Sequence, residues 1–285
     1  MLDIAEQSGC VITVSRELPG LCGPNAEKVL ERVAGSNHPG QAGSNTCGAL
    51  ALGENGLWSC SGVFLDHRRG IVMCHGAIFS PFLSLPLDTA WSDRQLLQAE
   101  DFSPDLLIQV QCRGRVVFMT QLVSPYDIAV LELEESFYGV PEPVLGSQFC
   151  TGEDVSILSF GAFGKSCGPS VTSGILSAVV TVDNTPVMLQ TTCAVHGGSS
   201  GGALISTHTG ELLGIVASNT RDSSIGATYP HLNFSVPINV LEPALRQYLQ
   251  SQDLQAFQHL NQANSAVAAA WRLQKKPTQV LPSRL

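Results

Sequence analysis

Twelve short runs of apolar and β-branched residues follow one another along the chain, and glycine, proline, asparagine or serine separates most of them. Short strands divided by such turn residues are typical of an all-β sandwich or barrel. Because a closed barrel leaves no free strand edge, the sequence predicts an all-β fold of two six-stranded β-barrels. The predicted strands cover residues 10–14, 57–65, 70–74, 106–112, 115–121 and 128–133, then 154–160, 174–182, 187–191, 202–205, 212–218 and 232–237.

The domain organisation follows from what lies between and after these runs. Residues 136–148 contain two prolines and little periodicity, as a linker does. We predict an N-terminal barrel over residues 1–135, interrupted by a Gly-, Asn- and Pro-rich insertion loop at 18–55, and a C-terminal barrel over 149–237. Apolar residues then recur at helical spacing, which predicts a helical segment and exposed tail over 238–285 that packs on the second barrel.

Composition and charge exclude several classes of partner. The 285 residues carry a formal net charge of −9 without a basic run, so the chain lacks the positive surface that nucleic-acid binding requires. Its apolar runs are shorter than the roughly 20 residues of a membrane-spanning helix. Acidic residues near the N-terminus argue against a secretory signal peptide. We therefore expect neither a nucleic-acid partner nor a membrane span.

The cysteines indicate a reducing compartment. There are nine, an odd number, and none belongs to a C-x-x-C pair. This spacing argues against both a disulfide framework and a zinc site, and favours small buried thiols. We expect the protein to need no metal and no organic cofactor.

The segment HGGSSGGALI at residues 196–205 contains the best candidate for a nucleophile. Glycines around Ser200 allow a tight turn, and the amides of Gly198 and Ser200 are then placed to bind an oxyanion. A glycine-rich hairpin loop is the structural alternative. The segment also fits G-x-S-x-G, the nucleophile elbow of α/β-hydrolases, but a strand follows here, where the elbow requires a helix.

Two further residues complete a candidate triad in the chain order His, Asp, Ser. Asp127 precedes the strand-like IAVLEL, and the segment DIAV carries the orienting aspartate in trypsin-like proteases. His75 lies at the end of a predicted hairpin, directly after the strand 70–74 and 52 residues before Asp127, and Ser200 follows Asp127 by 73 residues. The histidine of those proteases would fall slightly later, on Gly76 or Ala77.

The order of these segments resembles trypsin-like serine proteases, particularly the high-temperature-requirement type, with chymotrypsin-like barrels. Residues 113–285, including GRVVFMTQLVSPYDIAVLELEE and PVMLQTTCAVHGGSSGGAL, resemble the family of trypsin-like peroxisomal leader-peptide-processing proteases. Residues 5–16 and 57–83 resemble the N-terminal region of the same family. A middle part of the family pattern, with its histidine in a C-R-H-V segment, is missing near Cys112 or Arg113. Either His75 replaces that histidine, or the shortened chain lacks a base.

The resemblance implies a serine endopeptidase of the peroxisomal matrix that processes imported proteins. It places Ala194 in the substrate pocket, which favours a small or uncharged residue at the cleaved position, and aligns Val216, Ala217 and Ser218 with the substrate backbone. The C-terminal Ser283, Arg284 and Leu285 match the pattern that a peroxisomal import receptor reads. The alternative is a catalytically incompetent form that binds peptides or associates with full-length copies.

Overall fold

The structure is a computed structural model that describes residues 9–16, 58–84, 101–104, 106–110, 112–121, 124–138, 142–160, 168–222 and 227–272, with the backbone alone at 16, 109, 218–222 and 227–230. The predicted insertion loop at 18–55 and the tail residues Ser283, Arg284 and Leu285 lie outside these ranges.

The first half of the chain forms a closed antiparallel barrel with the strand order β1-β2-β3-β6-β5-β4. A short 3-10 helix, η1 (Gly76–Phe82), begins directly after β3. The strands are β1 (Gly9–Arg16), β2 (Trp58–Asp66), β3 (Ile71–His75), β4 (Leu106–Gln109), β5 (Arg113–Met119) and β6 (Ile128–Leu133).

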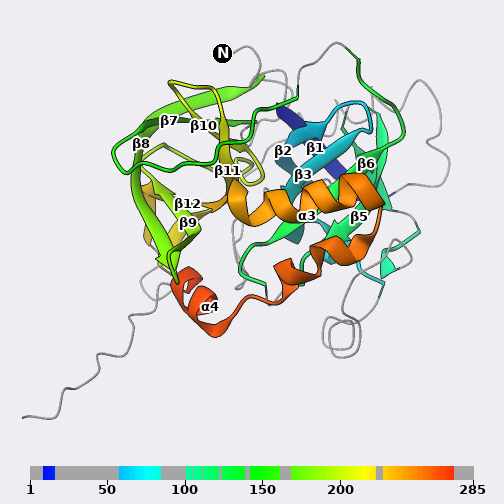
Figure 1. Ribbon diagram of the computed structural model, residues 1–285. Helices are drawn as coiled ribbons and strands as arrows, with labels where there is room; N and C mark the ends of the chain where they lie inside the picture. The colour runs from blue at the N-terminus through cyan, green and yellow to red at the C-terminus, as the bar shows by residue number, and fades with distance from the viewer. Residues whose placement is uncertain are drawn as a thin grey trace, which may run out of the picture.

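The second half forms another closed antiparallel barrel, with the order β10-β11-β12-β9-β8-β7, and the two barrels lie side by side (Figure 1). The predicted pair of six-stranded barrels is therefore confirmed. The strands are β7 (Asp154–Ser159), β8 (Ser170–Val182), β9 (Thr185–Thr191), β10 (Ala203–Ser206), β11 (Leu212–Asp222) and β12 (Ala227–Pro237).

All twelve predicted strands overlap an observed strand, and the largest differences in where a strand begins are at β8 and β12. β8 begins four residues earlier than predicted and β12 five residues earlier. The added residues, SVTS and ATYPH, lack apolar alternation. Side-chain periodicity reports burial on a core face, so it does not detect strand ends that continue by backbone pairing alone.

Alternating side chains of β3 enter two different cores. Val72 and Cys74 belong to the interior of the first barrel. Ile71 and Met73 belong instead to the cluster that contains Ala203 of the second barrel and residues of the C-terminal helices. Because successive side chains of a strand point to opposite faces, the outer face of β3 is also the contact surface between the barrels.

The C-terminal helices contact both barrels, which differs from the expected packing on the second alone. α3 (Ile238–Ser251) packs on β9, β11 and β12, η4 (Leu254–Asn261) on β5, and α4 (Ser265–Trp271) on β8 and β9. Phe118 of β5 stacks on Phe257 of η4 with ring centroids 4.7 Å apart. The first barrel also has an apolar outer face, so the apolar side of the C-terminal helices packs on both barrels.

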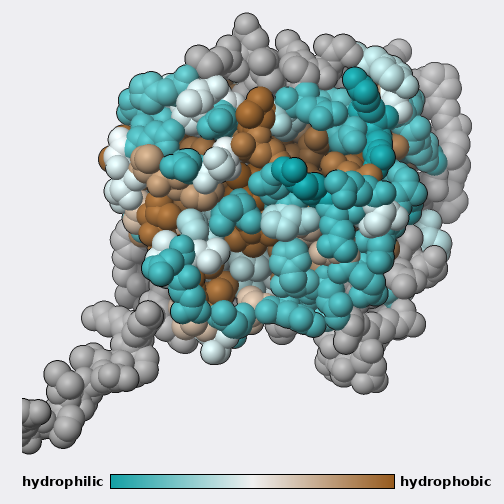
Figure 2. All heavy atoms as spheres, viewed as in Figure 1, coloured by the Kyte–Doolittle hydropathy of each residue, from teal (hydrophilic) through white to brown (hydrophobic). Residues whose placement is uncertain are grey.

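The outward and buried sides of α3 differ in hydropathy. Hydrophilic residues dominate the outward side of α3, and hydrophobic residues reach the surface over the strands beside it (Figure 2). The buried side of α3 consists of apolar or aromatic residues at helical spacing, namely Ile238, Leu241, Ala244, Leu245 and Tyr248. No helix in the described ranges combines the length and apolar character needed to cross a membrane.

Candidate active site

His75 is the last residue of β3, and its backbone pairs with Ile128 of β6. Its side chain follows the parity of Met73, so it points out of the first barrel on the side where the barrels meet. Only 9% of its surface is exposed. The strand therefore places a nearly buried imidazole at the contact between the two barrels.

Asp127 lies directly before β6 and faces this imidazole. Its carboxylate Oδ2 is 3.4 Å from His75 Nδ1, which is within ion-pair distance. The alignment is not that of a hydrogen bond, and Nδ1 is buried without a hydrogen-bond partner among the described residues. The backbone N–H of Gly76 donates to the carbonyl of Asp127 over 2.9 Å. The structure thus brings together the predicted base and its orienting acid.

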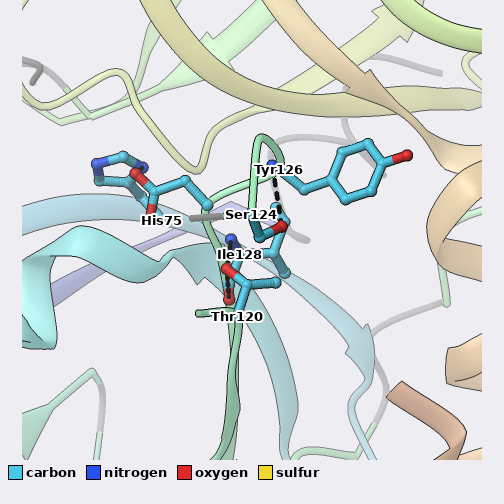
Figure 3. A network of polar contacts seen from close by, with 6 residues as sticks. His75, Thr120, Ser124, Tyr126 and Ile128 are labelled. Carbon is cyan, nitrogen blue, oxygen red and sulfur yellow. Dashed lines mark hydrogen bonds and ion pairs between the residues drawn. The ribbon is translucent and has the colours of Figure 1, made fainter. Parts of the chain in front are cut away.

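The backbone of Asp127 is held in an unusual conformation. Its φ of +50° lies in the left-handed region, which costs a non-glycine residue about 1–2 kcal/mol. Thr120 closes the loop around it: Thr120 N–H donates to the carbonyl of Ile128 over 2.9 Å, and Thr120 Oγ1 accepts from Ile128 N–H over 3.0 Å. Figure 3 shows this pair beneath the loop, with His75 on one side.

Residues 124–127, called the acid loop below, are also held by the C-terminal helices. Ser124 Oγ donates to the carbonyl of Leu260 over 2.7 Å. The ring of Tyr126 points away from His75 (Figure 3) and meets Trp271 edge-on, with centroids 6.1 Å apart. Two helical elements that follow Ser200 in the chain therefore support the loop that presents Asp127.

Cys74, next to His75, does not offer an alternative nucleophile. It is fully buried inside the first barrel. Burial raises the pKa of its thiol well above the ordinary value, and Cys60, Cys10 and Asp127 raise this pKa further. Because the thiolate is the nucleophilic form, a thiol held neutral is unreactive.

Residues 196–202, called the nucleophile loop below, form a tight turn before β10. Gly198 and Gly201 have φ values of +92° and +85°, which favour glycine. A Cβ atom on Gly201 would lie 2.1 Å from the carbonyl oxygen of Ser61 and 2.9 Å from the backbone nitrogen of His75. Gly201 is thus required both by conformation and by close approach to the first barrel.

The amides of the nucleophile loop fall into two sets. Those of Ser199, Gly201 and Gly202 donate to the carbonyls of His196, Val216 and Ser199, over 2.7–3.0 Å. In the described part of the chain, no acceptor is found for the amides of Gly197, Gly198 and Ser200. The last two are the predicted oxyanion donors, and that role stays a prediction.

Ser200 is partly exposed, and its carbonyl accepts from the backbone N–H of Ser61 over 3.0 Å. This bond and the approach of Gly201 to His75 place the nucleophile loop directly against β2 and β3. The neighbouring Ser199 is buried and is held by Ser159, whose hydroxyl donates to Ser199 Oγ over 3.1 Å. Ser200 is therefore the serine of the pair left accessible.

The predicted pocket residues lie beside this loop. Ala194 is exposed, and its carbonyl accepts from Thr172 Oγ1 over 2.8 Å. The N–H of Val216 donates to the carbonyl of Gly202, and its carbonyl accepts from Gly201. Ala217 is the extra residue of a β-bulge between the pairs that Val216 and Ser218 make with β12. Both backbone groups of Val216 are therefore already bonded within the second barrel, so we expect a substrate backbone to pair only with residues after Val216.

Sequence reasoning missed Ser61 and the packing at Gly76. The hydroxyl of Ser61 donates to the carbonyl of Gly198 over 2.7 Å, although the two residues are 137 positions apart. No periodicity or motif signals a contact between the two barrels.

At Gly76, an added Cβ would lie 2.9 Å from Asp127 Oδ1. The only signal in the sequence was that the histidine of the family would fall on Gly76 or Ala77. Within the described ranges, no group of His, Cys, Asp or Glu is arranged to hold a metal ion.

The fold consists of two closed six-stranded barrels. One barrel carries a serine in a glycine-rich loop, and the other carries a His–Asp pair. Together these features define the class of trypsin-like serine peptidases. A family model for the trypsin-like peptidase domain matches residues 60–215, more than half of the chain. The chain therefore belongs to this family.

Particular relatives are found among curated proteins. The chain is 63% identical over 172 residues to the peroxisomal leader peptide-processing protease of Mus musculus, and this match covers 60% of the chain and 30% of the relative. The protein of the same name from Homo sapiens is 62% identical over 172 residues, with the same shares of each chain. The resemblance inferred from the sequence is thereby confirmed. The matched region spans about a third of these relatives.

More distant matches agree on the fold. The serine protease Do-like HtrB of Bacillus subtilis is 33% identical over 134 residues, which is 44% of this chain and 28% of that protein. A solved structure of the HtrA-type protease AlgW with tripeptide superposes with a TM-score of 0.51 at 15% identity, covering 88% of this chain and 63% of that one. This structural likeness supports the barrel fold alone.

Proposed function

We propose that this chain is a peroxisomal serine endopeptidase that processes imported matrix proteins, including removal of leader peptides. The observation that carries the proposal is the His75–Asp127 pair at 3.4 Å, beside a nucleophile loop bonded to β2. The compartment and the substrate class are supported by the names of the mouse and human relatives. The Ser283-Arg284-Leu285 tail supports capture by a peroxisomal import receptor.

The proposed mechanism is acyl-enzyme formation. Ser200 Oγ attacks the scissile carbonyl while its proton passes to Nε2 of His75, whose Nδ1 side faces Asp127. The amides of Gly198 and Ser200 stabilise the oxyanion that forms. His75 then gives its proton to the leaving amine as the C–N bond breaks, and water hydrolyses the acyl-enzyme by the same proton route. Ala194 and Ala217 favour a small or uncharged residue at the cleaved position.

A second candidate function is a catalytically incompetent module that binds peptides or associates with full-length copies of the protein. Two observations favour it. The Nδ1 of His75 lacks hydrogen-bond alignment with Asp127, and Asp127 Oδ1 faces the empty side-chain position of Gly76 instead. An imidazole one residue away from its required position loses the orientation that proton transfer needs.

Labelling by a fluorophosphonate probe separates the two candidates. A working enzyme is labelled, and both Ser200→Ala and His75→Ala abolish or strongly reduce labelling, because each removes one member of the nucleophile–base pair. Ser206→Ala is a matched control, because its hydroxyl bonds Glu153 at the far end of β10. An unlabelled parent chain that folds normally would exclude the endopeptidase and leave the binding module.

A further inference from the structure

Ser61 of β2 holds the nucleophile loop through both its backbone and its side chain. It is fully buried. Its N–H donates to the carbonyl of Ser200 over 3.0 Å, and its hydroxyl donates to the carbonyl of Gly198 over 2.7 Å. One residue of the first barrel therefore fixes the two carbonyls on either side of Ser199.

The same hydroxyl is anchored to the second barrel. It accepts from the N–H of Phe160, directly after β7, over 2.8 Å. The carbonyl of Phe160 lies farther away, at 3.3 Å, so the single hydroxyl proton is assigned to Gly198. Ser61 thus has a full set of partners and a fixed rotamer, as a buried hydroxyl requires.

Fixing these carbonyls determines which way the remaining amides point. The peptide plane between Gly198 and Ser199 is held at its carbonyl by Ser61 and at its N–H by His196. The plane between Ser200 and Gly201 is held in the same way by Ser61 and Val216. Peptide units are planar and trans, so these two fixed planes set the orientation of the Ser199–Ser200 plane between them, which carries the Ser200 amide. They also help to set the plane before Gly198, which carries the Gly198 amide.

We propose that Ser61 is a positioning residue for oxyanion binding, which holds the amides of Gly198 and Ser200 towards the reacting carbonyl. The inference rests on the proposed function. Ser61 touches no substrate atom in this mechanism. It acts by holding the nucleophile loop of one barrel against the other. Removing its hydroxyl leaves the carbonyl of Gly198 without this donor and the N–H of Phe160 without its acceptor.

The test compares Ser61→Ala with Ser61→Thr, which keeps a hydroxyl, and with Ser156→Ala as a control. Ser156 is a buried serine of β7 whose hydroxyl contacts Ser173 and Thr207, away from the nucleophile loop. For fluorophosphonate labelling, we expect Ser61→Ala to lower the maximal inactivation rate about 10- to 100-fold with little change in the half-saturating probe concentration. Ser61→Thr should recover part of that rate, and Ser156→Ala should label like the parent.

A second measurement does not depend on activity. Hydrogen exchange is followed in the nucleophile loop of the full chain carrying Ser200→Ala, with and without Ser61→Ala. We expect at least about tenfold faster exchange at Ser199, whose peptide plane loses the hydroxyl of Ser61, when Ser61 is alanine, and unchanged exchange in the strands of the first barrel. Unchanged exchange in the loop, or labelling of Ser61→Ala at the rate of Ser156→Ala, would overturn the proposal. If the parent is never labelled, the proposed function fails and the exchange result alone decides the role of Ser61.

Discussion

The carboxylate oxygen Oδ1 of Asp127 lies 2.9 Å from the point that a Cβ atom of Gly76 would occupy. The other oxygen, Oδ2, lies 3.4 Å from Nδ1 of His75. The acid therefore faces two adjacent positions of the chain, of which one carries an imidazole and the other carries no side chain. This relationship makes the position of the base experimentally testable.

Moving the imidazole by one residue should test where Asp127 prefers it. We expect the double variant His75→Ala, Gly76→His to be labelled by a fluorophosphonate at least about tenfold faster than His75→Ala alone, because general-base catalysis contributes about 10²–10⁴-fold. The new Cβ crowds Asp127 and the carbonyl of Ile128, so a loss of about 1 kcal/mol in stability should accompany the gain. Equal labelling of the two variants, with both folded, would show that Asp127 does not support a base at position 76.

Replacing Gly201 should disrupt the contact between the barrels. Gly201→Ala adds a Cβ atom 2.1 Å from the carbonyl of Ser61 in a backbone with φ of +85°. We expect a loss of about 2 kcal/mol or more in the free energy of unfolding, together with loss of labelling. Gly152→Ala is the control, since φ is +90° there but nothing lies within 4 Å of the added atom. Chemical denaturation that finds both variants equally destabilised would mean that the conformational cost alone matters.

The support of the acid loop by the C-terminal helices predicts an effect of Ser124. Ser124→Ala removes the hydrogen bond to Leu260 and should cost about 1–2 kcal/mol, because a buried carbonyl loses its donor. Labelling should slow by more than the small unfolded fraction explains, since Asp127 is less firmly held. Ser251→Ala, whose hydroxyl bonds Gln247 on an exposed helix end, should change neither quantity measurably. A parent-like labelling rate for folded Ser124→Ala would argue against this coupling.

Alkaline pH should destabilise the fold. Burial raises the pKa of Tyr126 above its ordinary value of 10.0. A raised pKa means that the folded state keeps a proton that the unfolded state has lost, so stability is fully present below pH 10 and falls as pH rises towards the folded pKa. Denaturant titrations between pH 8 and 11 should therefore give a shallower decline for Tyr126→Phe than for the parent. Parallel curves would assign the decline to other groups, such as the buried thiols of Cys10 and Cys74, whose pKa values burial also raises.

The barrels were predictable because short apolar runs such as the one with Ile12 and Val14 of β1 are separated by turn residues, and alternation marks a core face in many of them. The approach of His75 to Asp127 was predictable as part of an ordered triad. The bonds of Ser61 were not, because they join β2 to a loop 137 residues later and depend on how two closed barrels face each other. The contact of Leu260 with Ser124 was missed for the same reason: helical periodicity shows that a face is buried but not which surface covers it.

The support of the acid loop by η4 and α4 also has a consequence for the order of synthesis. A ribosome adds about 5–20 residues per second. Ser200 is therefore made roughly 4 to 14 s before Trp271, which meets Tyr126 in the finished fold. Throughout that interval the nascent chain carries the nucleophile without the helices that support its acid loop. If the proposed mechanism holds, we expect peptidase activity to begin only after the last helix has docked.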